Sequence, residues 1–161
     1  MGEDWVELER GTTTLYGACG GLWVMIVFGS PTNADMLLAR PSLAAMKRRH
    51  PEGFPSLTWV LPTAGYRMDH EARVTAATVT AEFDGTIRAQ ATLLEGTGFQ
   101  VATVRAVIAG LDMMSRSSAP KRTFSELEAA VTWCLHRLPP GAAPGSASAV
   151  ARAVRAAAPV S

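Results

Sequence analysis

The chain has 161 residues, of which 48% are apolar, and its formal net charge is +1. This is enough material for one domain to bury a core without disulfide bonds or structural metals. A charge so close to zero gives no overall field that would attract nucleic acid or an anionic membrane, so nucleic acid is not expected as a partner.

The cysteines and the N-terminal stretch indicate the cellular compartment in which the protein is expected. Cys19 and Cys134 are far apart, and neither belongs to a Cys-x-x-Cys or zinc-ligand pattern, so we expect buried, reduced thiols. Residues 1–11 are acidic and lack the apolar segment of a signal peptide. The longest apolar run, residues 22–28, is well short of the roughly 20 residues that a membrane span needs. The sequence therefore predicts a cytoplasmic protein without a transmembrane segment.

In the first half of the chain, strand patterns come before and after a helix pattern. Residues 4–10 alternate apolar and polar side chains, which is typical of a half-buried strand. Residues 21–29 are apolar at almost every position and predict a central strand covered on both faces. Residues 30–53 predict a helix interrupted at Pro41, and residues 56–62 predict a second fully apolar strand.

The same alternation continues in the second half. Asp69 can cap a helix that ends at residues 84–85, residues 87–95 predict a third long strand, and the turn at residues 96–98 leads into another helix. Ser125 and Glu128 have the spacing of a capping box at the start of the last helix of this series.

This pattern predicts an α/β fold with a single sheet of about four strands, mostly parallel and packed with helices. Residues 1–138 form the predicted domain. Residues 139–161 are a tail rich in Pro, Gly and Ala, with few large side chains. We expect this tail to be flexible unless it docks on the domain. Within the tail, residues 148–158 could form a short helix.

Several segments together resemble the SpoIIAA-like branch of the STAS superfamily. They are the apolar strand at residues 22–28, the turn into a helix at residues 27–36, the strand at residues 58–62 and, above all, Phe124 followed by Glu128 and Trp133. The resemblance implies a small STAS-like interaction domain without catalytic machinery. In the anti-sigma factor antagonists of this superfamily, a Ser that follows an Asp is phosphorylated after the third strand. The matching residues 62–69 contain no Asp-Ser-x-Gly.

The resemblance therefore favours a non-catalytic regulatory or scaffolding domain that binds another protein. We place the candidate protein-binding surface on the loop that carries Thr63, Gly65, Tyr66, Arg67 and Met68, whose residue types are common where proteins bind proteins. No catalytic residue and no cofactor is predicted.

Two other functions stay open. One is a small enzyme whose site is built by loops at the carboxyl ends of the strands, near Ser30, Thr63 and Gly96. The other is a lipid-binding or membrane-associated module. The apolar content and the basic residues 47–50 favour it. The same basic residues are typical of a solvated helix end, where cations complement the helix dipole.

The turn formed by Gly96, Thr97 and Gly98 is the one phosphate-loop candidate. A dinucleotide fingerprint would need a third glycine where the chain has Val101, and a Walker loop would need Gly-Lys-Ser/Thr. A weak anion site at the helix start is the alternative to a simple turn. His50, His70 and His136 have no second ligand at chelating spacing, so no metal site is predicted.

Overall fold

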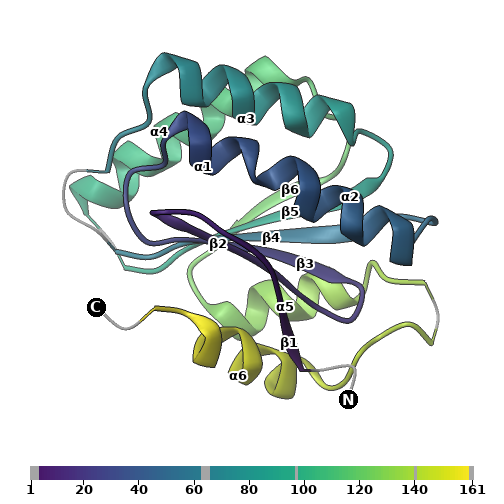
Figure 1. Cartoon of the computed structure of the whole chain (residues 1–161). Coiled ribbons are helices and arrows are strands. Elements are labelled where there is room, and N and C mark those ends of the chain that lie inside the picture. The colour runs from purple at the N-terminus through teal and green to yellow at the C-terminus, as the bar shows by residue number, and fades with distance from the viewer. Residues whose placement is uncertain (1–3, 63–65, 97, 140, 160–161) are drawn as a thin grey trace.

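The computed structural model describes residues 4–62, 66–96, 98–139 and 141–159. Its centre is one six-stranded sheet with the strand order β1-β2-β3-β4-β5-β6, and helices cover both faces of that sheet (Figure 1). The strands are β1 (Trp5–Arg10), β2 (Thr14–Cys19), β3 (Leu22–Val27), β4 (Phe54–Val60), β5 (Ile87–Leu94) and β6 (Lys121–Phe124). The helices are α1 (Asn33–Leu37), α2 (Ala39–Arg49), α3 (His70–Glu82), α4 (Phe99–Ser115), α5 (Leu127–Leu135) and α6 (Ala147–Ala157).

The sheet is mixed. β1, β2 and β3 form an antiparallel meander, whereas β3, β4, β5 and β6 are parallel neighbours joined by helical crossovers. The predicted α/β class and single sheet are confirmed. The predicted count of about four strands and the mostly parallel arrangement are corrected, because β2 and β6 were not expected and β2 is antiparallel to both of its neighbours.

The sequence pattern did not predict β2, because Gly17 and Ala18 interrupt its run of large apolar residues. All six of its residues are nevertheless buried. Gly17 has a packing role there. The indole of Trp5 on β1 lies directly over it, in the space that a Cβ atom would occupy. The close approach of the first two strands therefore depends on this glycine.

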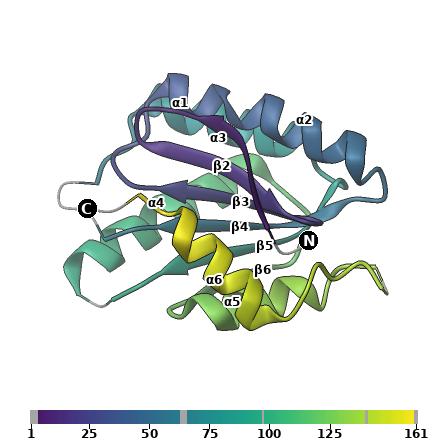
Figure 2. The same ribbon diagram turned by 60° about the horizontal axis from the view of Figure 1, so that its bottom comes forward.

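The two faces of the sheet carry separate cores. Helices α1 to α4 cover one face, which we call the cavity face, and α5 and α6 cover the other (Figures 1 and 2). On the cavity face the core includes Trp23, Met46 and Phe54, and on the opposite face it includes Leu22, Trp59 and Cys134. The result is a three-layer α/β/α arrangement.

The C-terminal segment contains α6, close to the short helix that the sequence allowed at residues 148–158, and this helix docks on the sheet. Ser146 caps α6, and Val150 and Val154 are fully buried in the core of the opposite face. Arg155 of α6 also forms a 3.2 Å ion pair with Glu95, which follows β5. Val150 and Val154 lie one helical turn apart, and Ala151 between them is buried in the same core.

Two predicted helix ends differ in detail. The interruption near Pro41 lies one turn earlier, at Leu38 between α1 and α2, because the ring of Pro41 fits the first turn of a helix but not its interior. The expected Ser125 capping box is absent, since Glu126 is the N-cap of α5 and makes no side-chain capping bond. Asp69 does cap α3, as expected, with its carboxylate 2.8 Å from the backbone nitrogen of Ala72.

Candidate ligand-binding cavity

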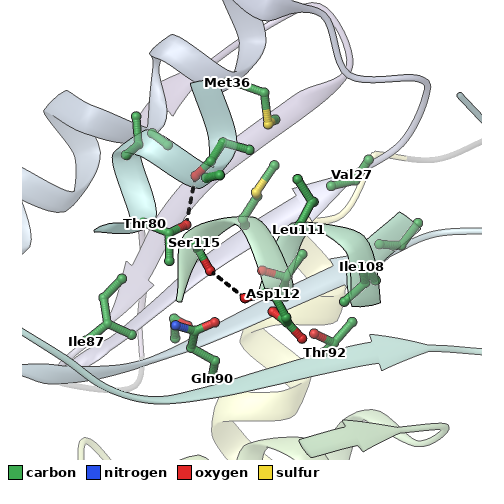
Figure 3. A pocket seen from close by; sticks show the side chains of 18 of the residues that line it. Val27, Met36, Thr80, Ile87, Gln90, Thr92, Ile108, Leu111, Asp112 and Ser115 are labelled. Carbon is green, nitrogen blue, oxygen red and sulfur yellow. Dashed lines mark hydrogen bonds between the residues drawn. The ribbon is translucent and has the colours of Figure 1, made fainter. Parts of the chain in front are cut away.

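A cavity of about 140 Å³ lies between the cavity face of the sheet and helices α1 to α4. Its size is comparable to an apolar cavity of about 150 Å³ that binds benzene in another protein. Figure 3 shows Asp112 and Ser115 on α4 and Gln90 and Thr92 on β5, all lining this space. The larger apolar residues that line it are Trp23, Met25, Val27, Met36, Leu43, Val60, Tyr66, Met68, Val79, Ile87, Ile108 and Leu111.

The floor of this cavity is unexpectedly polar. Parallel pairing aligns residues from neighbouring strands in two rows that start at buried apolar residues of β3 and end at the edge strand β6. The rows are Trp23, Ser56, Gln90 and Lys121, and Met25, Thr58, Thr92 and Thr123. The central members of both rows, on β4 and β5, line the cavity, so polar groups lie where a sheet covered by helices normally has apolar ones.

Several polar groups of these floor residues have donors or acceptors that are not used in hydrogen bonds to described residues. Thr58 and Thr92 are half-buried, and their hydroxyl groups make no hydrogen bond to any residue that the structure describes. Ser56 donates only a long bond of 3.5 Å to the carbonyl of Ala89. Gln90 uses its amide nitrogen to donate to the Ser117 hydroxyl at 3.0 Å, which leaves its side-chain carbonyl as an acceptor.

Asp112 supplies the charge of the cavity. It is half-buried, and burial raises the pKa of its carboxyl group, while Lys121 acts in the opposite direction. Lys121 forms no ion pair with it, because the ammonium group donates to the backbone carbonyls of Ser117 and Ala119 at 2.9 and 3.4 Å. Within the described part of the chain, no side chain donates a hydrogen bond to the Asp112 carboxylate.

The segment before α3 closes one side of the cavity and corrects part of the predicted protein-binding loop. Tyr66 and Met68 are buried and line the cavity, so they do not project from the surface as expected. Arg67, between them, is exposed, and its backbone nitrogen donates to the Ser30 hydroxyl at 2.8 Å. Thr63 and Gly65 lie outside the described residues, and binding of a partner here stays a prediction.

The Gly96 to Gly98 turn adopts conformations that favour glycine. Gly96 and Gly98 have φ values of +92° and +101°, and Gly98 is the N-cap of α4. The turn therefore accounts for both glycines without a ligand. Thr97 lies outside the described residues, and the weak anion site stays untested.

A second cavity of about 110 Å³ lies beside this turn, at the carboxyl ends of β4 and β5 where the enzyme alternative places a site. Its charged group, Glu95, already accepts hydrogen bonds from the Trp59 indole at 3.0 Å and from Arg155 at 3.2 Å. The described residues of its walls include no His, Cys or Ser, so they do not bring a nucleophile and a base together.

No family model, curated protein or solved structure matches this chain. The function must therefore be argued from the site itself.

Other reactive groups in the described residues are not arranged as a reaction centre. Cys19 and Cys134 are free and buried, as expected, and burial raises their pKa values to about 11 and about 12. No group of three or more His, Cys, Asp and Glu among the residues described could hold a metal ion. Likewise, none of the described helices has the length and apolar character needed to cross a membrane.

The basic residues that supported the lipid-binding alternative lie at a helix end. Lys47, Arg48 and Arg49 are exposed in the last turn of α2, where they complement the helix dipole. They are not among the residues that line the cavity.

Proposed function

We propose that this protein is a non-catalytic regulatory domain that binds a small molecule in the cavity between the sheet and α4. The observation that carries the proposal is the polar floor formed by Ser56, Thr58, Gln90 and Thr92. These polar groups reach the open space of the cavity, where a ligand would provide them with hydrogen-bond partners.

The composition of the walls indicates an amphipathic ligand. At the end of the cavity nearest β3, the walls are apolar and include Met25 and Met36, whose flexible side chains adapt to the shape of a bound group. Towards β5 and α4 the walls present hydroxyl, amide and carboxyl groups. A molecule with one aromatic ring or short chain and one polar end matches both halves, whereas a two-chain lipid is far too large for this volume.

Binding of 2-phenylethanol, a neutral amphipathic probe, tests the proposal. Trp23 lines the cavity, and Trp5, Trp59 and Trp133 pack on the opposite face, so the probe should change the fluorescence of Trp23 alone. Replacing Trp23 by Phe should remove the signal. The probe should also raise the unfolding temperature of the unmodified protein.

Two variants at the cavity make this test specific. Ala77→Leu should fill the space from α3 and abolish binding, and Thr92→Val should weaken binding by removing one hydroxyl. Thr78→Val is the matched control, because Thr78 is exposed on α3 and does not line the cavity. If Ala77→Leu is folded and still binds as the unmodified protein does, the cavity is not the binding site.

The resemblance to SpoIIAA-like domains supports a second role, in which the domain acts on another protein. The specific observation in its favour is that Tyr66 and Met68 line the cavity while Arg67 between them faces solvent. A ligand that moves the two buried side chains would alter the surface around Arg67. Cavity occupancy would thus regulate partner binding at this surface.

An Arg67→Ala variant tests this second role. It should lose a partner that the unmodified protein captures from its native cell, with no change in unfolding temperature, because the exposed side chain contributes little to folding. Arg73→Ala, at an exposed position on the neighbouring helix α3, is the control. Equal capture by Arg67→Ala and the unmodified protein would exclude the Arg67 surface.

A further inference from the structure

We infer that the ligand of this cavity carries an ammonium group that pairs with Asp112. The inference rests on the proposed function and adds the chemical class of the ligand to it. The ligand is a small arylalkyl or alkyl amine, and its apolar part lies in the region of Trp23, Met25 and Met36.

The cavity wall carries a negative charge. Among the described residues that line the cavity, Asp112 is the only one with a charged side chain, and it approaches from α4 on the side opposite the sheet (Figure 3). An anionic ligand would meet repulsion with no cation in the wall to offset it. A cationic ligand would place its charge beside a carboxylate in a partly enclosed space, where the attraction is screened less than at the surface.

The Asp112 carboxylate has no hydrogen-bond or ion-pair partner among the described residues. It makes no ion pair, and Lys121, the cation that influences it, is held by the carbonyls of Ser117 and Ala119. Burial is the cause of the raised pKa of Asp112, and Lys121 opposes it only in part. An ammonium group would provide both the charge and the hydrogen-bond donors that the carboxylate lacks.

The neighbouring side chains also suit an ammonium group. An ammonium group has three N–H donors, and the Thr58 and Thr92 hydroxyl groups and the side-chain carbonyl of Gln90 are acceptors in the same cavity wall. Trp23 and Tyr66 add aromatic surface for the apolar part of the ligand. The cavity volume of about 140 Å³ limits the ligand to a small amine with no more than about one ring.

Three probes that share one skeleton test the inference by calorimetric titration at neutral pH. They are 2-phenylethylamine, 2-phenylethanol and phenylacetate, which differ in the charge of the polar end. We expect the amine to bind about tenfold or more tightly than the alcohol, since a charge-assisted hydrogen bond adds that much, and phenylacetate to bind most weakly.

Asp112→Asn is the decisive variant, because it keeps the size of the side chain and removes its charge. It should reduce amine binding to the level of the alcohol and leave alcohol binding within about twofold of the unmodified protein. Glu128→Gln, which removes an exposed carboxylate on α5 and does not line the cavity, should leave all three affinities unchanged.

The two possible failures are distinct. If the alcohol binds as tightly as the amine, or if Asp112→Asn keeps full amine binding, the cavity binds ligands but the ammonium inference is overturned. If none of the three probes binds to the folded protein, both this inference and the proposed function are overturned.

Discussion

The hydroxyl group of Thr13 donates a 2.6 Å hydrogen bond to the carboxylate of Asp35, and this contact ties the turn between β1 and β2 to the start of α1. The same carboxylate accepts bonds from the backbone nitrogens of Thr12 and Thr32 at 2.7 and 3.0 Å. Thr32 in turn caps α1 in a reciprocal capping box. Gly11 lies so close that a Cβ atom there would contact the carboxylate.

Replacing Asp35 by Asn should destabilise the protein. Asp35 is buried and ionised, and its hydrogen-bond donors lower the pKa of the carboxyl group to about 2 against the desolvation that raises it. Relative to an unfolded value of about 3.9, this corresponds to about 2–3 kcal/mol at neutral pH. Denaturant titration of both proteins at pH 7 measures the difference in the free energy of unfolding.

The pH dependence of that difference has a definite sign. Because the folded pKa is lowered, the stabilisation is fully present above about pH 5 and is lost as the pH falls through 4 towards 2. The gap between Asp35→Asn and the unmodified protein should therefore shrink over this range. Glu128→Gln, at an exposed position, serves as a control with little effect. A gap that is constant from pH 7 to pH 2 would contradict the assignment.

Removal of α6 should lower stability. Val150→Ala should cost about 1–3 kcal/mol, because it leaves a cavity in the core of the opposite face. A chain that ends at Leu138 should unfold at a temperature lower by more than several degrees. Arg152→Ala, at an exposed position of the same helix, should change stability by less than about 0.5 kcal/mol. Equal unfolding temperatures for the truncated and full chains would mean that α6 contributes nothing.

The two tryptophans of the opposite face should differ in their contributions. Trp59 is 1% exposed and its indole nitrogen bonds to Glu95, so Trp59→Ala should cost about 3–5 kcal/mol. Trp133 is half-buried between Phe124 and Arg137, with a ring separation of 5.7 Å to Phe124, so Trp133→Ala should cost less. Thermal unfolding of both variants gives the order, and a larger loss for Trp133 would contradict this packing.

The cysteines should react slowly with alkylating reagents in the native protein. Neither Cys19 nor Cys134 is exposed, and burial raises both pKa values, which suppresses the thiolate that reacts. The alkylation rate should rise steeply only as denaturant unfolds the chain. Rapid modification without denaturant would show that one of the thiols is accessible.

Local sequence patterns predicted β1, β3, β4, β5, α3 and α4, because each has an alternation, a continuous apolar run or a helical stripe. The β2–β3 hairpin was missed although Gly20 and Gly21 mark its two-residue turn, a pattern that is typical of hairpins. β6 was missed because its four residues, three of them exposed at the sheet edge, carry no apolar alternation.

The cavity could not be derived from the sequence, because it depends on register and on helix placement. One signal was available. Ser56 and Thr58 alternate on a segment predicted as fully apolar, and Gln90 and Thr92 do the same on the next strand. On a strand that is buried on both faces, polar residues at every second position all lie on one face, so they indicate a polar site on that face. Pairing of these positions across β4 and β5 became visible only with the register.

Nuclear magnetic resonance titration with 2-phenylethanol is a direct test of a ligand site between the sheet and α4, because it reports where the probe binds. We expect saturable shifts concentrated on residues that line the cavity, including Thr92, Ile108 and Leu111, with little change at Val131 and Val150 on the opposite face. Shifts spread over the surface, or confined to the α5 and α6 face, would contradict a ligand site between the sheet and α4.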